Sequence, residues 1–281
     1  MELGLKDRVV LITGASGGIG RALAVAFAEE GARLVLHGGS QMGGLEAWLG
    51  RQAWQDRALA VHAEISDAAS VETLFQRGLE RFGRIDVAIA NAGRWTPEHR
   101  LAHEASIERV KSNLATNLHG ALWTTQSFFR ALARTGPRPG EGASLILIGS
   151  TAGHFGERGH MEYSVSKAGL YGILYSGKNE IVELDPFGRV NLLEPGWTVT
   201  HMAREALEQP GLIGRVLRTM PLRQLARAGD IAQSALFLAS PRAARHLSGQ
   251  VITVAGGMEG RILWENGQID EAAVRRRAQE E

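Results

Sequence analysis

The sequence predicts a single α/β domain built on a doubly wound parallel sheet of seven strands. Short apolar runs alternate with helical stretches along the chain, which is the pattern of a parallel sheet covered on both faces. The first apolar run leads into a glycine-rich turn and then into a helix. A length of 281 residues, without an evident internal repeat, fits one domain of this class.

The predicted strands are short runs rich in β-branched residues and bounded by turn residues. They cover residues 8–13, 33–37, 58–62, 86–90, 144–148, 189–193 and 251–254. Apolar residues at helical spacing predict helices over 19–30, about 67–82, 107–134 and around Tyr163. The turn-rich segment 136–142 is predicted as a loop and not a linker, because the sheet pattern continues on both sides of it.

Composition limits the classes of function. Apolar residues make up 44% of the chain and charged residues 22%, which suits a sizeable core. The 31 basic and 30 acidic residues leave a net charge of +1, so we expect no nucleic-acid partner. The absence of cysteine excludes disulfides and thiolate metal sites. No apolar run approaches the ~18 residues of a membrane span, and no signal peptide is recognisable, so we expect a cytoplasmic protein with no membrane partner.

A glycine-rich turn follows the first predicted strand, where residues 13–20 read Thr-Gly-Ala-Ser-Gly-Gly-Ile-Gly. Glycines let backbone amides approach a pyrophosphate closely, and the N-terminus of the next helix offers unpaired N–H groups. Such a turn can be purely structural, but its position between strand and helix predicts nucleotide binding. The predicted contacts are Gly14, Ser16, Gly18, Ile19 and Gly20.

A second turn, Asn91-Ala92-Gly93, ends the fourth predicted strand. Ligands of open parallel sheets bind beyond the carboxyl ends of the strands, so we expect Asn91, Ala92 and Gly93 to lie beside the same ligand. A turn selected only for its backbone conformation would explain the tripeptide equally well.

Tyr163 and Lys167 are four residues apart, so on a helix they share one face. A lysine ammonium beside a phenol favours the phenolate. We therefore expect the pKa of Tyr163 to fall from about 10 toward the working range of a general acid/base. Such a pair alone is common on helix surfaces. The glycine turn and Ser150, thirteen positions before Tyr163, give the pair its significance.

These motifs, together with Pro195-Gly196, occur in the order and spacing of the short-chain dehydrogenase/reductase family. Residues 6–257 resemble its single-domain branch of about 250 residues. The resemblance implies that Tyr163 is the acid/base and that Ser150 hydrogen-bonds the substrate oxygen. It implies that Lys167 lowers the pKa of Tyr163 and holds the nicotinamide ribose, so both residues also contact the cofactor.

The resemblance extends to further positions of the site. Asn117 matches the asparagine of the family's proton relay, and Asn113, one turn earlier, is the competing assignment. Pro195, Gly196 and Thr198 resemble the loop that passes the nicotinamide. A substrate lid is implied over about 198–222, although its helically spaced apolar residues are also typical of a core.

Six residues beside the motifs or in the lid are candidate walls of a substrate pocket. They are Trp95, His154, Phe155, His160, Trp197 and Met202. The histidines have no clustered carboxylates beside them, so we expect no metal.

The resemblance implies NAD or NADP as the cofactor. NAD-preferring relatives usually end the second strand with an aspartate, and residues 36–40 here contain no acid. We therefore expect NADP to be favoured over NAD, with Ser40 as a donor to the 2′-phosphate and His37 as the nearby positive candidate. The basic residues common in NADP-preferring relatives are missing too. Glu64 and Ile65 replace the usual Asp-Val beside the adenine.

The expected activity is that of an NAD(P)-dependent oxidoreductase acting on a small ketone or secondary alcohol. A catalytically silent nucleotide-binding or regulatory relative is one alternative, and an epimerase or dehydratase of related fold is another. Family members are mostly dimers or tetramers, so we expect a homodimer or homotetramer. The candidate interface residues, which could equally face the sheet, are Leu114, Leu118, Leu122 and Phe129.

The domain is expected to cover residues 1–257, and residues 258–281 extend beyond the family's usual end. The charged stretch 270–281 has the composition of a helix. It could pack over the active site of a neighbouring subunit, or it could fray.

Overall fold

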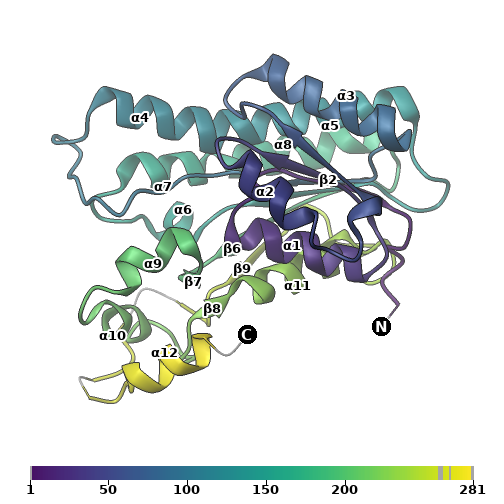
Figure 1. The fold of residues 1–281 in the computed structure, drawn as a ribbon. Helices are drawn as coiled ribbons and strands as arrows, with labels where there is room; N and C mark the ends of the chain where they lie inside the picture. Colours follow the sequence, from purple (N-terminus) through teal and green to yellow (C-terminus); the bar gives the residue numbers. More distant parts are fainter. Residues whose placement is uncertain (1, 259–261, 266, 280–281) are drawn as a thin grey trace.

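The computed structural model describes residues 2–258, 262–265 and 267–279, and it places seven strands in one parallel sheet (Figure 1). The order across the sheet is β3-β2-β1-β4-β5-β6-β9, and every neighbouring pair is parallel. The strands are β1 (Val9–Ile12), β2 (Arg33–Gly38), β3 (Ala58–His62), β4 (Val87–Ala90), β5 (Ser144–Ile148), β6 (Arg189–Pro195) and β9 (Val251–Val254). The predicted doubly wound, seven-stranded fold is confirmed, with shifts of one or two residues at strand ends.

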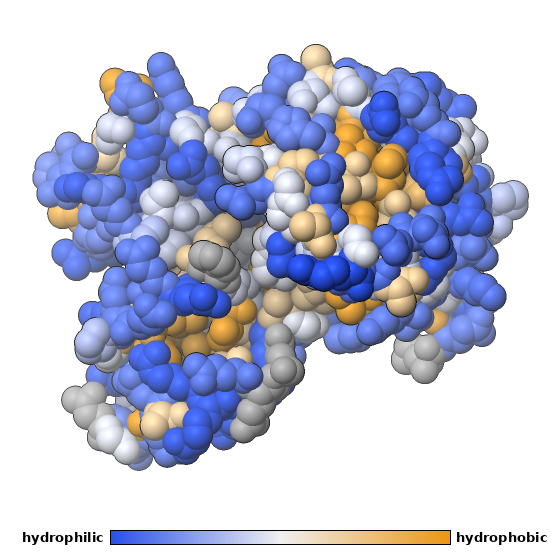
Figure 2. Space-filling view, in the orientation of Figure 1, coloured by the Kyte–Doolittle hydropathy of each residue, from blue (hydrophilic) through white to orange (hydrophobic). Residues whose placement is uncertain are grey.

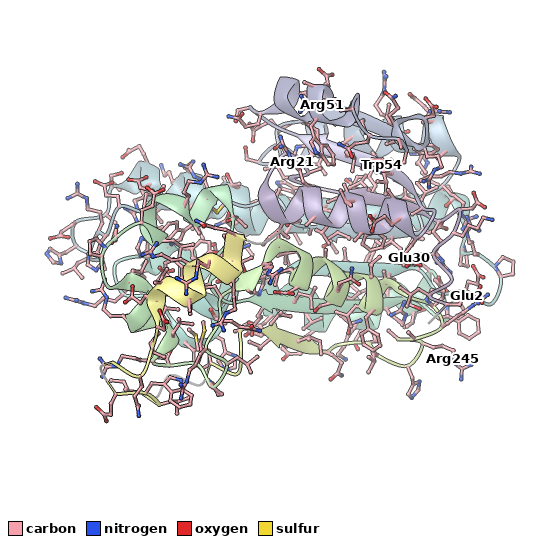
Figure 3. The ribbon with its side chains drawn as sticks, turned by 60° about the horizontal axis from the view of Figure 1, so that its bottom comes forward. Glu2, Arg21, Glu30, Arg51, Trp54 and Arg245 are labelled. Atoms are coloured by element: carbon pink, nitrogen blue, oxygen red, sulfur yellow. The ribbon has the colours of Figure 1, made fainter. Side chains whose placement is uncertain are left out.

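Helices cover both faces of the sheet because successive strand residues point to opposite faces. Val10 and Ile12 of β1 lie in a core shared with α1 (Gly18–Glu29) and α11 (Ala228–Ala239), two helices that lie side by side (Figure 3). Val9 and Leu11 lie in a second core with the residues of three other helices. These are α3 (Ala68–Phe82), α5 (Gly120–Thr135) and α8 (Leu170–Glu180). Burial on both faces explains why the strands show no polar alternation.

The direction of the strand order reverses between β1 and β4. The chain winds from β1 to β2 and β3 on one side, then crosses to β4, β5 and β6 on the other. In open parallel sheets the crevice at such a reversal, beyond the carboxyl ends of the strands, is where ligands bind. The glycine turn after β1 and the Asn91-Ala92-Gly93 turn after β4 both end at this crevice.

The predicted helix over 107–134 is interrupted, which corrects the sequence-based prediction. It consists of α4 (Ile107–Leu114), a π-helical turn (Ala115–His119) and α5. The π turn carries Asn117, and such turns often occur at functional sites. Gly120 follows it at a close approach, since a Cβ there would lie 2.8 Å from Cγ1 of Ile65.

A small lobe lies beside the carboxyl ends of the strands (Figure 1). A two-stranded sheet of β7 (Thr198–Val199) and β8 (Ala226–Arg227) joins it to the main body. The lobe contains α9 (His201–Leu207), α10 (Leu212–Leu217) and the tail helix α12 (Glu271–Gln279). Its own apolar cluster includes Val274 of α12 together with Leu207, Ile213 and Leu217. Apolar residues also gather on the lobe where it faces the body (Figure 2).

The tail therefore packs on the small lobe of its own chain. Arg275 donates a hydrogen bond to the Leu207 carbonyl at 2.8 Å, and Glu271 accepts one from the Gly214 amide at 3.0 Å. Trp264 donates through its indole N–H to the Met220 carbonyl at 2.6 Å. Residues 259–261, 266 and 280–281 of the predicted extension lie outside the described residues. No helix in the described part of the chain is both long and apolar enough to span a membrane.

Candidate active site

A cavity of about 510 Å³ opens beyond the carboxyl ends of the central strands, between the body and the lobe. Its volume lies within the range of small-molecule sites. Seventeen of the predicted site residues line it. They are Gly14, Ser16, Gly18, Ile19, Gly20, Asn91, Gly93, Trp95, Ser150, Phe155, Tyr163, Lys167, Pro195, Gly196, Trp197, Thr198 and Met202.

The glycine turn forms a concave backbone surface, a cradle, and two of its positions can be occupied only by glycine. Gly14 has φ of +67°, and a Cβ there would lie 2.8 Å from Cα of Ala92. A Cβ on Gly20 would lie 2.2 Å from the Gly14 carbonyl oxygen. Helix α1 begins directly after Gly17, which has no side chain to cap it, so the first N–H groups of the helix stay available to an anion. The cradle therefore fits a dinucleotide pyrophosphate.

The turn after β4 braces the glycine turn. The backbone amides of Asn91 and Ala92 both donate to Oγ1 of Thr13 at 3.0 Å. The Asn91 side-chain amide donates to the Thr13 carbonyl at 2.8 Å and to the Gly14 carbonyl at 3.2 Å. Asn91 and Gly93 line the cavity, whereas Ala92 lies behind it. The tripeptide is thus more than a local turn, because it fixes the cradle in position.

Tyr163 and Lys167 lie on α7 (Met161–Ala168) and face the cavity together with Ser150. The Lys167 ammonium donates to the Ile148 carbonyl, at the end of β5, at 2.9 Å and lies 5.9 Å from the centre of the Tyr163 ring. Ser150 caps α6 (Thr151–Phe155) by accepting from the Ala152 amide at 3.1 Å, and its hydroxyl hydrogen-bonds Tyr163. A phenol, a hydroxyl and an ammonium thus converge beside the glycine turn.

The expected fall in the pKa of Tyr163 is not found, and the reason is desolvation. Burial raises the pKa of Tyr163 to about 12, the negative charge of Glu157 adds to that rise, and the Ser150 hydrogen bond opposes it. Burial also lowers the pKa of Lys167 to about 8. The spacing on one helix face was predicted correctly, but burial dominates the pKa of each group, and neither shift is caused by the other residue.

Asn117 connects three elements. Its side-chain oxygen accepts from the Arg94 amide at 2.7 Å, and its amide nitrogen donates to Asn113 at 2.8 Å and to Ser166 at 3.1 Å. It lies next to Lys167, since a Cβ on Gly93 would be 3.3 Å from the Asn117 oxygen and 3.4 Å from the Lys167 nitrogen. Asn113, the competing candidate, lies behind Asn117 as its hydrogen-bond partner.

His37 is not the positive group that was expected near the cofactor. It is buried, its Nδ1 accepts from the Gly14 amide at 2.9 Å, and its Nε2 lies 3.0 Å from the Ala63 carbonyl. Since Nδ1 accepts, the ring is neutral and Nε2 carries the proton. Burial lowers the pKa of His37, which reinforces this form. His37 braces the glycine turn instead of contacting a phosphate.

The other residues expected at the adenosine end lie outside the cavity lining. Ser40 is exposed after β2, and Glu64 is exposed and accepts from the Ser66 amide at 3.1 Å. Ile65 is buried against Gly120. Gln41 does line the cavity, and no sequence motif had singled it out.

The predicted substrate walls separate into two groups. Trp95, Phe155, Trp197 and Met202 line the cavity, but His154 and His160 do not. His154 points to a polar cluster with Tyr171, 3.3 Å away, and Glu194. His160 lies behind Trp95, with the two rings stacked 5.1 Å apart. Glu157 lines the cavity and was missed, because it stands in a loop without periodicity or motif.

The fold and this site define a dinucleotide-binding oxidoreductase of the doubly wound class. A family model described as enoyl-(acyl carrier protein) reductase matches residues 14–259. The chain belongs to the short-chain dehydrogenase/reductase family, as its motifs suggested, and is an NAD(P)-dependent oxidoreductase.

Curated relatives and a solved structure are similar over nearly the whole chain. L-rhamnose 1-dehydrogenase (NAD(P)(+)) of Azotobacter vinelandii is 35% identical, covering 90% of this chain and 97% of the relative. The 3-oxoacyl-[acyl-carrier-protein] reductase FabG of Escherichia coli is 31% identical, covering 91% and 99%. A short-chain dehydrogenase/reductase of Brucella melitensis, titled glucose/ribitol dehydrogenase, has a TM-score of 0.82 at 28% identity and covers 93% of this chain and 100% of its own.

Proposed function

We propose that the chain interconverts a secondary alcohol and a ketone with NADP, with Tyr163 as the acid/base. The supporting observation is the convergence of Tyr163, Ser150 and Lys167 in the cavity beside the glycine cradle. A bound nicotinamide would supply or accept the hydride. The chain itself must move the proton of the reacting oxygen and stabilise the charge that develops on it.

In the oxidation direction, the Tyr163 phenolate takes the proton of the substrate hydroxyl, and in the reduction direction the phenol returns it. The Ser150 oxygen accepts from the Ala152 amide, so its single proton, which hydrogen-bonds Tyr163 in this structure, would turn to the reacting oxygen when a substrate is bound. Lys167 favours the phenolate through its positive charge and is oriented by the Ile148 carbonyl. Asn117 holds the loop after β4 against α7 and so positions Lys167.

The end of β2 supports NADP as the preferred cofactor. Residues 38–41 contain no carboxylate that would repel a 2′-phosphate, and exposed Ser40 can donate to one. With His37 neutral, positive charge comes from Arg21, which points from α1 toward α2 (Met42–Leu49) (Figure 3). Its guanidinium lies 3.5 Å from the Gly44 carbonyl and 5.5 Å from the centre of the Trp48 ring.

The substrate class follows from the pocket and not from the relatives, because one relative is named for a sugar and another for a 3-oxoacyl thioester. We further propose an assembly of two or four copies and a cytoplasmic location, where nicotinamide dinucleotides are available. The assembly is supported by exposed apolar side chains on neighbouring helices, among them Leu122 of α5 and Val165 of α7.

Tyr163→Phe tests the proposal. Loss of the only proton-transfer group on the reacting oxygen should lower turnover by about 10²- to 10⁴-fold, with the affinities for NADP and NAD largely retained. Nicotinamide absorbance with alcohol and ketone panels gives turnover, and fluorescence titration with both cofactors gives affinity. Tyr175→Phe, an exposed tyrosine on α8, is the matched control and should keep full activity. Equal turnover in Tyr163→Phe and the wild-type enzyme would refute the assignment, and conversion without net cofactor consumption would indicate an epimerase.

A further inference from the structure

Glu157 is a carboxylate on the wall of the catalytic cavity that proton transfer at Tyr163 does not use. It lies in the loop between α6 and α7, and its side chain is 27% exposed, so a ligand can reach it. Its negative charge contributes to the raised pKa of Tyr163, which means that the two groups are close. The neighbouring carboxylate, Glu162, has a cationic partner at 2.6 Å in Arg109.

The partner of Glu157 is His160, with Oε1 and Nδ1 3.4 Å apart. The other ring nitrogen of His160 lies 3.0 Å from the Thr96 carbonyl, so it must carry a proton. Nδ1 is buried and has no hydrogen-bond partner in the described part of the chain, and the Glu157 carboxylate lies next to it. The imidazole beside Glu157 therefore offsets part of the cost of burying a carboxylate there.

Two tryptophans flank this carboxylate. Trp95 donates its indole N–H to Glu157 and stacks on His160, so its position is fixed from two sides. Trp197 meets Trp95 edge to face, with ring centres 6.1 Å apart and planes at 80°. The wall is thus a rigid corner of flat apolar surface with a carboxylate at its edge. Trp95 occupies one of the roughly four acceptor positions of the carboxylate and His160 lies beside a second, so at least two remain for a ligand.

We propose that Glu157, held between Trp95 and His160, is a substrate-binding carboxylate that accepts hydrogen bonds from hydroxyl groups next to the reacting carbon. The substrate is then a polyhydroxylated compound of the sugar or polyol class, with its C–H face against the tryptophans. This inference rests on the proposed oxidoreductase activity and specifies its substrate.

Two other substrate classes fit this wall less well. An acyl chain has no donor for the carboxylate and would bury it at a cost. A cationic amine would be attracted by Glu157, but Arg94, which lines the same cavity, would repel it. A vicinal diol satisfies the two free acceptor positions and leaves the tryptophans a non-polar face.

The test compares matched substrates, 1,2-cyclohexanediol and cyclohexanol, with acetoacetyl-CoA and 2-aminocyclohexanol as representatives of the other classes. We expect the wild-type enzyme to prefer the diol, and Glu157→Gln to lower the ratio of kcat/KM for diol over cyclohexanol by about 10- to 100-fold. Glu157→Asp keeps the negative charge on a side chain that is one methylene shorter, so it should lower the ratio less. It replaces Glu157→Gln in the test if that variant does not fold. Glu108→Gln, an exposed carboxylate on α4, should leave the ratio unchanged.

The outcomes separate this inference from the proposed function. An unchanged ratio in both Glu157 variants, or a wild-type preference for cyclohexanol, acetoacetyl-CoA or the amine, would overturn the subsite while leaving the oxidoreductase intact. Failure to turn over any alcohol or ketone with either cofactor would overturn both. Thermal melting and cofactor titration of each variant establish that the fold and the cofactor site are retained.

Discussion

His37 shows that the type of a residue does not by itself give its charge in the folded protein. Its position at the end of the second strand suggested a cation for a phosphate, yet the structure holds it as a neutral acceptor for the Gly14 amide. The same holds for Tyr163. Its spacing from Lys167 correctly predicted that both residues lie on one helix face, but it did not predict the pKa of the phenol. The spacing of two residues can be taken directly from the sequence, but their protonation depends on burial and on residues distant in the chain.

The neutral form of His37 makes folding stability depend on pH. Burial lowers its pKa in the folded state below the unfolded value of about 6.5, so its contribution is present above that pH and is lost as pH falls through the folded pKa. We expect His37→Gln, which cannot titrate, to lose less stability than the wild-type protein between about pH 7.5 and about pH 5. Urea unfolding at both pH values measures the difference.

His103→Gln, a histidine whose side chain is 78% exposed, is the control and should keep the wild-type dependence. The same loss of stability on acidification in His37→Gln and wild type would contradict the role assigned to His37.

At the element scale, periodic apolar patterns identified the seven strands and several helices, because each of these buries one face or both. Elements with a less regular environment were not found. The π turn around Asn117, helices α2 and α11, and the pairing of β7 with β8 have no strong period in the sequence. The tail helix was anticipated from composition, but its place on the small lobe was not, since that depends on contacts made by Val274 across about 60 residues.

Because α12 completes the apolar core of the lobe, we expect Val274→Asp to loosen the substrate lid. An unpaired carboxylate at this buried position should cost roughly 2–4 kcal/mol and open the lobe locally. The value of kcat/KM for substrate should fall about 10- to 100-fold, while cofactor affinity changes little. Steady-state kinetics and limited proteolysis within the lobe measure both effects.

Ala272→Asp adds the same charge to an exposed position of the same helix and should behave as wild type. Wild-type kinetics and protease resistance in Val274→Asp would show that the tail does not support the lid.

At the scale of the whole molecule, one layer of helices exposes large apolar side chains. The helices α4, α5, α7 and α8 cover the same side of the sheet (Figure 1), and they expose several large apolar side chains. These are Ile107, Leu122, Met161, Val165 and Tyr175. Of the residues predicted for the interface from the sequence, Leu122 is exposed, whereas Leu114, Leu118 and Phe129 are partly buried within the chain.

We expect copies of the chain to associate through this face, and Val165→Arg to disrupt the assembly. Val165 is 52% exposed, and an unpaired charge buried in an interface costs roughly 3–5 kcal/mol. Light scattering should report a dimer or tetramer for the wild-type protein and a smaller species for the variant. Phe187→Arg, at a similarly exposed apolar position in the turn before β6, should leave the mass unchanged. A wild-type monomer, or an unchanged mass in Val165→Arg, would contradict this expectation.

The sequence by itself determined the sheet, the crevice at its reversal and the residues that meet there. Apolar periodicity, glycine conformation and the spacing of Tyr163 and Lys167 are local properties, and parallel strands bring their carboxyl ends to one edge wherever they occur. Only the tertiary structure decided the charge states and the substrate wall. Burial raises the pKa of Tyr163, the Gly14 amide keeps His37 neutral, and Glu157 lies 3.4 Å from His160. These states arise from desolvation and from contacts between distant segments, which no local pattern records.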